Sequence, residues 1–150
     1  MEKVIMTLAE FEAEAARFVG GLVPQGRRAT LVTLSGDLGA GKTTFTQVVA
    51  KTLGVEETVT SPTFVLEKIY QLPSELGGET PKFTRLAHID AYRLESGSDL
   101  ASIGFDELMQ EVGNLILLEW PEKVSDMLPV PAVKVSILAH EDGSRTITYG

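Results

Sequence analysis

GDLGAGKTTF, residues 36–45, is the stretch that decides the fold of this 150-residue chain. Its outer glycines, Gly36 and Gly41, are separated by four residues, and Lys42 and Thr43 follow at once. Glycine accepts unusual backbone dihedral angles and lets N–H groups come close to a bound anion. This spacing is that of the phosphate-binding P-loop. The stretch therefore predicts that a phosphate group binds against it.

The segments on either side give the loop the context that it requires. RATLVTLSG (28–36) is short and apolar and predicts a buried strand, and KTTFTQVVAKTL (42–53) predicts a helix. The positive end of the helix dipole would face the phosphates, with Lys42 at the β- and γ-phosphates and the Thr43 hydroxyl at Mg²⁺. The predicted nucleotide-binding residues of the loop are Gly36, Asp37, Leu38, Gly39, Ala40, Gly41, Lys42, Thr43 and Thr44.

Composition limits what the rest of the chain can do. Its length suits one domain, and we expect a single P-loop ATPase domain over residues 1–150. Without cysteine there is no disulfide or thiolate metal site. The acidic N-terminus and the lack of a long apolar run predict a cytoplasmic protein with no membrane contact. A formal net charge of −8 argues against general nucleic-acid binding and leaves room for a basic protein partner.

The other segments predict an α/β fold. Thr7 and Glu10 form a capping-box pattern before an amphipathic helix, whose apolar face is predicted to be Leu8, Phe11, Ala15, Phe18 and Leu22. Strands are predicted within 64–70, 83–90 and 114–120, one or two short helices within 96–113, and an exposed loop over 71–82. Pro121 is expected to begin a brief helix, and residues 132–140 and 144–150 predict a hairpin.

This order of elements favours a three-layer sandwich like that of P-loop NTPases. The central sheet is predicted to be mixed and mostly parallel, with an antiparallel C-terminal hairpin. In this interpretation the first element of the chain is a helix, because the first strand recognised is the one that leads into residues 36–45.

Two acids end apolar strands and are candidates to complete the site. Asp90 ends LAHID and Glu119 precedes the last residue of LILLEW. The carboxyl ends of parallel strands would open onto the P-loop, where Mg²⁺ needs an acid. One acid would hold Mg²⁺ and the other would orient the attacking water, and the spacing leaves both assignments open. A solvated strand-end carboxylate is the alternative for each.

Other polar and aromatic residues have two readings. Thr63, in the turn SPTF after the P-loop helix, lies where switch loops occur and is a candidate for the γ-phosphate, or is simply a turn residue. Trp120 either borders the site or anchors the core. His88, inside an apolar strand, is expected to be a satisfied core histidine, and His140 to be solvated. Arg93 and Arg145 are more typical of surface ion pairs.

Taken together, the motifs resemble those of one family. GDLGAGKTT, SPTF, HIDAYRL and LLEWPEK occur in the order and spacing found in the TsaE (YjeE) ATPases, over residues 4–148. The resemblance implies a small ATPase in the synthesis of threonylcarbamoyladenosine in tRNA, with ATP and Mg²⁺ as cofactors. It implies TsaB and TsaD as partners, with tRNA reached only through their complex.

The same resemblance implies roles for individual residues. Thr43 and Glu119 would serve Mg²⁺, Asp90 would be the second essential acid, and Thr63 would belong to a switch-like segment. Trp120 would lie beside the nucleotide. For the adenine, the corresponding residues are Phe11 near the N-terminus and Arg145 near the C-terminus.

Two other functions fit a P-loop. A small-molecule kinase would need an acceptor pocket and a lid with arginines, and the loop 71–82 contains no arginine. A nucleotide-gated interaction module would bind ATP or GTP with little turnover. The sequence has no guanine-reading NKxD-like segment, which favours ATP.

Overall fold

Seven strands form one mixed sheet in the computed structural model, which describes residues 1–57, 59 and 66–150. The strand order is β1-β7-β6-β2-β5-β4-β3. The elements are β1 (Glu2–Ile5), α1 (Leu8–Gly20), β2 (Thr30–Ser35), α2 (Lys42–Thr52), β3 (Glu67–Gln71), β4 (Arg85–Asp90), η1 (Gly97–Ile103), α3 (Phe105–Gln110), β5 (Asn114–Glu119), η2 (Pro121–Lys123), β6 (Val133–Ala139) and β7 (Arg145–Tyr149).

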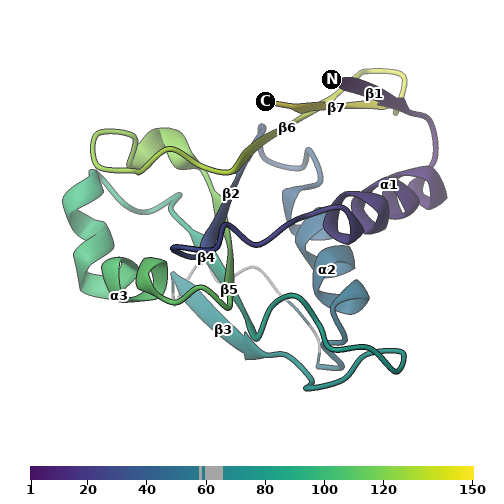
Figure 1. The fold of residues 1–150 in the computed structure, drawn as a ribbon. Coiled ribbons are helices and arrows are strands. Elements are labelled where there is room, and N and C mark those ends of the chain that lie inside the picture. The colour runs from purple at the N-terminus through teal and green to yellow at the C-terminus, as the bar shows by residue number, and fades with distance from the viewer. Residues whose placement is uncertain (58, 60–65) are drawn as a thin grey trace.

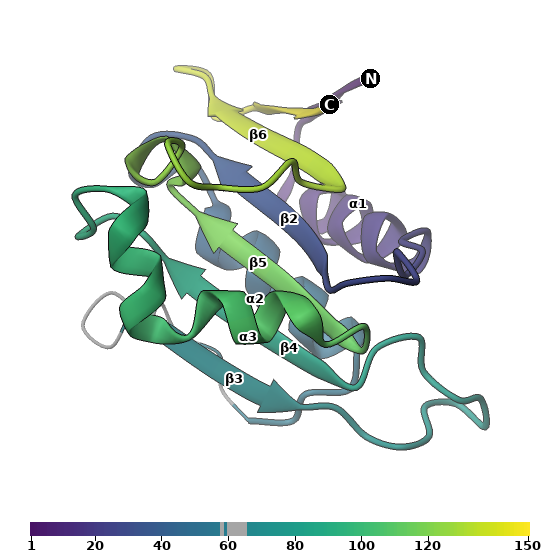
Figure 2. The same ribbon diagram turned by 60° about the vertical axis from the view of Figure 1, so that its left-hand side comes forward.

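The four central strands of this sheet are parallel. β2 pairs with β5 and β6, and β5 pairs with β4, all in parallel register. At one edge of the sheet β3 pairs antiparallel with β4, and at the other edge β7 pairs antiparallel with β6 and with β1. Helices α1 and α2 cover one face, and η1 and α3 lie on the other (Figures 1 and 2). The predicted three-layer α/β sandwich with its C-terminal hairpin is confirmed.

Two apolar cores fill the space between the sheet and its helices. Along β2, Val32 and Leu34 belong to the core under α1 and α2, whereas Leu31 belongs to the core on the α3 side. This alternation follows from the pleat, which turns successive side chains to opposite faces. Because both faces are covered, β2 and β5 are apolar almost throughout, as parallel strands inside α/β sheets usually are.

Helix α1 begins and packs largely as its sequence predicts. The Thr7 hydroxyl accepts a hydrogen bond from the Glu10 N–H at 3.1 Å. Phe11, Ala15, Phe18 and Leu22 are buried. Leu8, in contrast, is 59% exposed, so its predicted place on the buried face is wrong. It occupies the first turn, on the solvent side.

The sequence interpretation missed the first strand. β1 precedes α1 and pairs antiparallel with β7, so the sheet extends beyond the predicted hairpin. The two chain ends lie side by side there (Figure 1), and the terminal ammonium of Met1 donates to the Tyr149 carbonyl at 3.2 Å. A four-residue edge strand has too little hydrophobic pattern to be recognised without its partner.

The remaining predicted elements are close to those observed. β3 occupies part of the predicted strand 64–70, η1 and α3 lie within 96–113, and η2 begins at Pro121. The turn at 60–63, including Thr63, lies outside the described residues. Among the described residues, no helix has both the length and the apolar character that crossing a membrane requires.

A buried carboxylate joins the first helix to the last strand. Glu14 is 8% exposed and accepts hydrogen bonds from Arg17 and from the Tyr149 hydroxyl, the latter at 2.6 Å. The hydrogen bond from Arg17 is the main reason that the pKa of Glu14 lies below its ordinary value, against the opposing effect of burial. The Tyr149 ring also stacks on Phe18, with centroids 5.2 Å apart.

We expect Tyr149→Phe to lower the free energy of unfolding by about 1–2 kcal/mol at pH 7, because it removes a hydrogen bond to a charged acceptor. Since the folded pKa of Glu14 is depressed, the charged network is fully present above the unfolded pKa of about 4.3 and is lost as the pH falls through the folded pKa. The difference between the variant and the parent protein should therefore narrow in acid. Urea denaturation at several pH values measures both effects.

Tyr70→Phe is the matched control. The Tyr70 hydroxyl is buried and has no hydrogen-bond partner among the described residues, so its removal should cost little or stabilise the fold. Equal losses from the two substitutions would contradict the role given to the Glu14–Tyr149 bond.

Candidate nucleotide site

The P-loop fills a narrow passage between β6, α1 and the start of α2. Gly36 has φ 152°, and a Cβ at that position would lie 2.5 Å from the Ile137 carbonyl oxygen on β6. Gly41 has φ 116°, and its Cβ would lie 3.2 Å from the Phe11 ring on α1. Both the dihedral angles and the neighbours exclude larger residues. Gly36 and Gly41 are therefore required by the packing of the loop.

Lys42 begins α2 and turns its side chain back into the loop. It is 5% exposed, and its ammonium donates to the carbonyl oxygens of Gly36 and Asp37, the second at 2.9 Å. It also lies 4.2 Å from the centroid of the Trp120 ring. Burial lowers the pKa of Lys42, and the charges of Glu119 and other nearby acids act in the opposite direction.

The two strand-end acids lie side by side. β4 and β5 are parallel, and their register pairs Asp90 with Glu119 at the carboxyl ends of both strands. They are 4% and 3% exposed. The Asp90 carboxylate accepts a hydrogen bond from the Tyr92 N–H at 3.0 Å. Burial of two neighbouring carboxylates costs free energy unless hydrogen bonds and positive charge stabilise them, and Lys42 supplies part of that charge.

Glu119 has a second buried neighbour that the sequence interpretation did not use. The Nε2 atom of His88 lies 2.5 Å from Glu119 Oε2, and the imidazole is fully buried. The position of a histidine two residues before an acid in an apolar strand was visible in the sequence. Its partner was not, because Glu119 lies on another strand.

A pocket of about 310 Å³ brings these groups together. Ten of the predicted residues line it, and Tyr92 is an addition. The lining is Leu38, Gly39, Gly41, Lys42, Thr43, Thr44, Asp90, Tyr92, Glu119, Trp120 and Arg145. It therefore combines the start of α2, the ends of β4 and β5, and the first residue of β7.

Of the predicted residues that the structure describes, four lie outside this lining. Three of them, Gly36, Asp37 and Ala40, belong to the P-loop but do not line the pocket. Phe11 is 0% exposed, so the structure does not place it where a base could touch it. Instead its ring supports Arg145, whose guanidinium carbon lies 5.3 Å from the ring centroid. The expected contact of Phe11 with adenine stays a prediction.

Aromatic rings form one wall of the pocket. Tyr92 and Trp120 have centroids 5.0 Å apart, and Tyr92 is 41% exposed. Trp120 adopts φ 60°, an uncommon conformation for a non-glycine residue. The backbone N–H of Trp120 donates to the Leu34 carbonyl at 3.2 Å. The backbone of β2 therefore holds Trp120 beside the pocket.

The donors of the pocket fit a magnesium–triphosphate group. The first N–H groups of α2 have no acceptor within the helix and point toward the loop. The Thr43 hydroxyl and the two carboxylates are hard oxygen ligands of the kind that Mg²⁺ takes. Within the described residues no cluster of three or more His, Cys, Asp or Glu side chains could hold a metal alone. Further oxygen ligands would have to come from phosphate or water.

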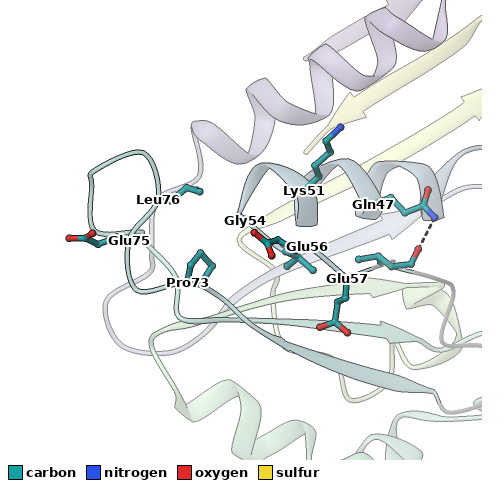
Figure 3. A pocket seen from close by; sticks show the side chains of 10 residues that line it. Gln47, Lys51, Gly54, Glu56, Glu57, Pro73, Glu75 and Leu76 are labelled. Atoms are coloured by element: carbon teal, nitrogen blue, oxygen red, sulfur yellow. Dashed lines mark hydrogen bonds between the residues drawn. The ribbon is translucent and has the colours of Figure 1, made fainter.

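A larger cavity lies elsewhere on α2 (Figure 3). It measures about 640 Å³ and is lined by Gln47, Lys51, Gly54, Val55, Glu56, Glu57, Val59, Pro73, Glu75 and Leu76. Figure 3 shows the hydrogen bond from the Gln47 amide to the Val59 carbonyl, 2.7 Å long. None of the predicted site residues lines this cavity. Despite its size, we therefore place the candidate site at the P-loop pocket.

Comparisons with known proteins agree with one another. The model of the family described as "Threonylcarbamoyl adenosine biosynthesis protein TsaE" matches residues 8–147. Proteins named tRNA threonylcarbamoyladenosine biosynthesis protein TsaE are similar: that of Rickettsia bellii is 34% identical over 93% of this chain and 90% of its own length, and that of Treponema pallidum is 38% identical over 93% of both. The crystal structure of Bacillus subtilis YdiB superimposes with a TM-score of 0.75 at 29% identity, covering 99% of this chain and 83% of YdiB.

We expect Gly36→Ala to lower the free energy of unfolding by about 2–4 kcal/mol, because the new Cβ meets a backbone oxygen and the backbone is strained. Gly39→Ala is the matched control: its φ is also positive, at 80°, but a Cβ there has nothing within 4 Å. For Gly39→Ala, backbone strain alone should lower the free energy of unfolding by about 1 kcal/mol. Urea denaturation of the two variants measures the difference, and equal losses would contradict the close contact with Ile137.

Proposed function

This chain belongs to the TsaE family of threonylcarbamoyl adenosine biosynthesis proteins, and from that membership we propose that it is an ATPase acting with TsaB and TsaD. In this proposal it hydrolyses ATP to ADP and phosphate. Hydrolysis supports the TsaB–TsaD pair as that pair transfers threonylcarbamoyl to an adenosine of tRNA. The observation that carries the proposal is the shared pocket of P-loop, Lys42 and two strand-end acids.

The loop would bind the β- and γ-phosphates through backbone N–H groups and Lys42. In the structure the Lys42 ammonium is satisfied by two loop carbonyls and lies against Trp120. Phosphate oxygens would replace these neutral acceptors with charged ones, and charge-assisted hydrogen bonds are about twice as strong. In this proposal Lys42 exchanges the loop carbonyls for the oxygens of a triphosphate bound at the start of α2.

The Thr43 hydroxyl and the Glu119 carboxylate are the proposed protein ligands of Mg²⁺. Bound there, the ion would neutralise negative charge on the phosphates as the γ-phosphoryl group is transferred. Asp90, which lies beside Glu119 in the register, would accept a hydrogen bond from the attacking water. Its own bond from the Tyr92 N–H fixes the carboxylate in orientation.

Arg145 and Trp120 would hold the nucleoside. Both line the pocket, and Phe11 supports Arg145 from below through its ring face. Thr63 lies outside the described residues, and its role at the γ-phosphate stays a prediction.

An incomplete site explains why partner proteins would be needed. Arg145 is the one arginine in the described lining of the pocket, and its guanidinium carbon lies 5.3 Å from the centroid of the Phe11 ring. A second cation at the γ-phosphate, which accelerates many P-loop enzymes, would then come from a partner. The net charge of −8 suits association with a basic protein face and does not suit a direct grip on tRNA.

We expect Lys42→Ala to reduce phosphate release by about 100-fold or more, because it removes the main cation at the transferred phosphoryl group. Release should be slow with the protein alone and should rise when TsaB and TsaD are added. Lys51→Ala, at the exposed other end of the same helix, should behave like the parent protein. A malachite green assay with and without the partners measures each rate.

Two outcomes would replace the proposal. Transfer of the phosphate to a metabolite would indicate a small-molecule kinase. Nucleotide binding without release under every condition would indicate an interaction module.

We expect Glu119→Gln and Asp90→Asn to fail in different ways. Glu119→Gln should raise the Mg²⁺ concentration for half-maximal ATP binding by about tenfold or more, since it weakens a metal ligand. Asp90→Asn should leave ATP binding within about threefold and lower kcat by about 100-fold, the usual value of a positioned base. Calorimetry and steady-state kinetics separate the two, with Glu12→Gln on the exposed side of α1 as control. Unchanged Mg²⁺ dependence would remove Glu119 from the site.

A further inference from the structure

His88 is a buried histidine on β4, and its Nε2 atom lies against the Glu119 carboxylate. It is 0% exposed, and it lies two residues before Asp90 on the same face of the strand. The register opposes it to Leu117 on β5, which is two residues before Glu119. The imidazole therefore lies one layer below the two acids, on the side of the sheet that α2 covers.

Among the described residues, the imidazole makes one side-chain hydrogen bond, to Glu119. Nε2 lies 2.5 Å from Glu119 Oε2, and both side chains are almost fully excluded from water. The other ring nitrogen, Nδ1, is buried without a hydrogen-bond partner among the described residues. An ionised carboxylate only accepts hydrogen bonds, so Nε2 carries the proton and donates it. This tautomer is assigned from the geometry of the pair.

A purely structural role explains this arrangement poorly. A core histidine that serves only packing costs free energy when one nitrogen is left unpaired, and a leucine would fill the space without that cost. The feature that His88 alone supplies is a fixed donor under Glu119. Metal-binding carboxylates are commonly held by such outer hydrogen bonds.

We infer that His88 is a positioning residue, whose Nε2–H holds Glu119 Oε2 so that Oε1 faces the pocket as the magnesium ligand. The inference rests on the proposed function and adds a residue to it. Within the described residues, Glu119 Oε1 has no hydrogen-bond partner of its own. The bond would leave this oxygen oriented and available.

Lys42 makes such restraint necessary. Among the charges that act on Lys42, that of Glu119 has the largest effect. An ion pair between Glu119 and this ammonium would withdraw both groups from the nucleotide. His88 opposes that pairing because it holds the carboxylate at the strand, which leaves Lys42 to the loop and the phosphates.

The test compares His88→Gln with His88→Leu. The Gln amide can donate from a similar position, whereas Leu fills the buried site without a donor. We expect His88→Leu to raise the Mg²⁺ concentration for half-maximal ATP binding by about tenfold or more. Affinity for ADP in EDTA should change less than about threefold, and His88→Gln should recover most of the Mg²⁺ dependence. The fluorescence of Trp120, the one tryptophan of the chain, reports binding without requiring turnover.

Two controls make the result specific. His140→Leu removes the other histidine of the chain, which is exposed and bonded to Thr146, and should leave binding unchanged. In a Glu119→Gln background, His88→Leu should add little to the Mg²⁺ effect, because the two residues act as one unit. Circular dichroism and thermal melts establish that each variant folds, and the Gln variant carries the test should the Leu variant fail to fold.

The two proposals fail in distinguishable ways. Parental Mg²⁺ dependence in a folded His88→Leu protein would overturn the positioning role and leave the ATPase proposal intact. A His88→Gln variant as impaired in Mg²⁺ dependence as Glu119→Gln would also overturn it, because a retained donor should rescue. A parent protein that binds ATP equally with and without Mg²⁺ would overturn both.

Discussion

The passage of Gly36 beneath the Ile137 carbonyl is the constraint on which the rest of the structure depends. A Cβ at this point would lie 2.5 Å from a backbone oxygen, so β2 can turn into the P-loop only through glycine. That turn sets the start of α2, with Gly41 lodged against Phe11. The same close packing that holds the loop therefore aims the N-terminus of α2 at the pocket, and the site follows from the fold.

Parallel register supplies the second half of the site. Because β4 and β5 run in the same direction and pair residue by residue, Asp90 and Glu119 emerge together, with His88 and Leu117 one layer below. A shift of one residue would turn all of these side chains to the opposite face of the sheet. The apolar side chains that alternate with them fill the core on the α3 side and oppose such a shift. The burial that stabilises the sheet thus also fixes the distance between the two acids.

The sequence predicted most features that depend on neighbours along the chain, although the exposed position of Leu8 was not among them. The P-loop, the Thr7 cap of α1 and the buried strands around the loop follow from local spacing, and the acids Asp90 and Glu119 were found because strand ends are recognisable. Features that depend on distant partners were missed. β1 is recognisable as a strand only through its pairing with β7. Phe11 is buried because it packs against Gly41 and Arg145, and the bond between His88 and Glu119 depends on the pairing of β4 with β5. The spacing of residues along the chain therefore identified candidate site residues, whereas their contacts became visible only from the pairing of the strands.

Electrostatics connects the buried groups to the function proposed. Two carboxylates and one ammonium, each at most 5% exposed, line one pocket inside a chain with a net charge of −8. Lys42 is the cation that this arrangement leaves for phosphate, because Glu119 is bonded to His88 and Asp90 to the Tyr92 backbone. The lysine gives up neutral carbonyl acceptors when it meets phosphate, whereas the carboxylates meet a triphosphate favourably only with a metal ion between them. Binding of the phosphate and of the metal ion should therefore be coupled through the charges of the pocket.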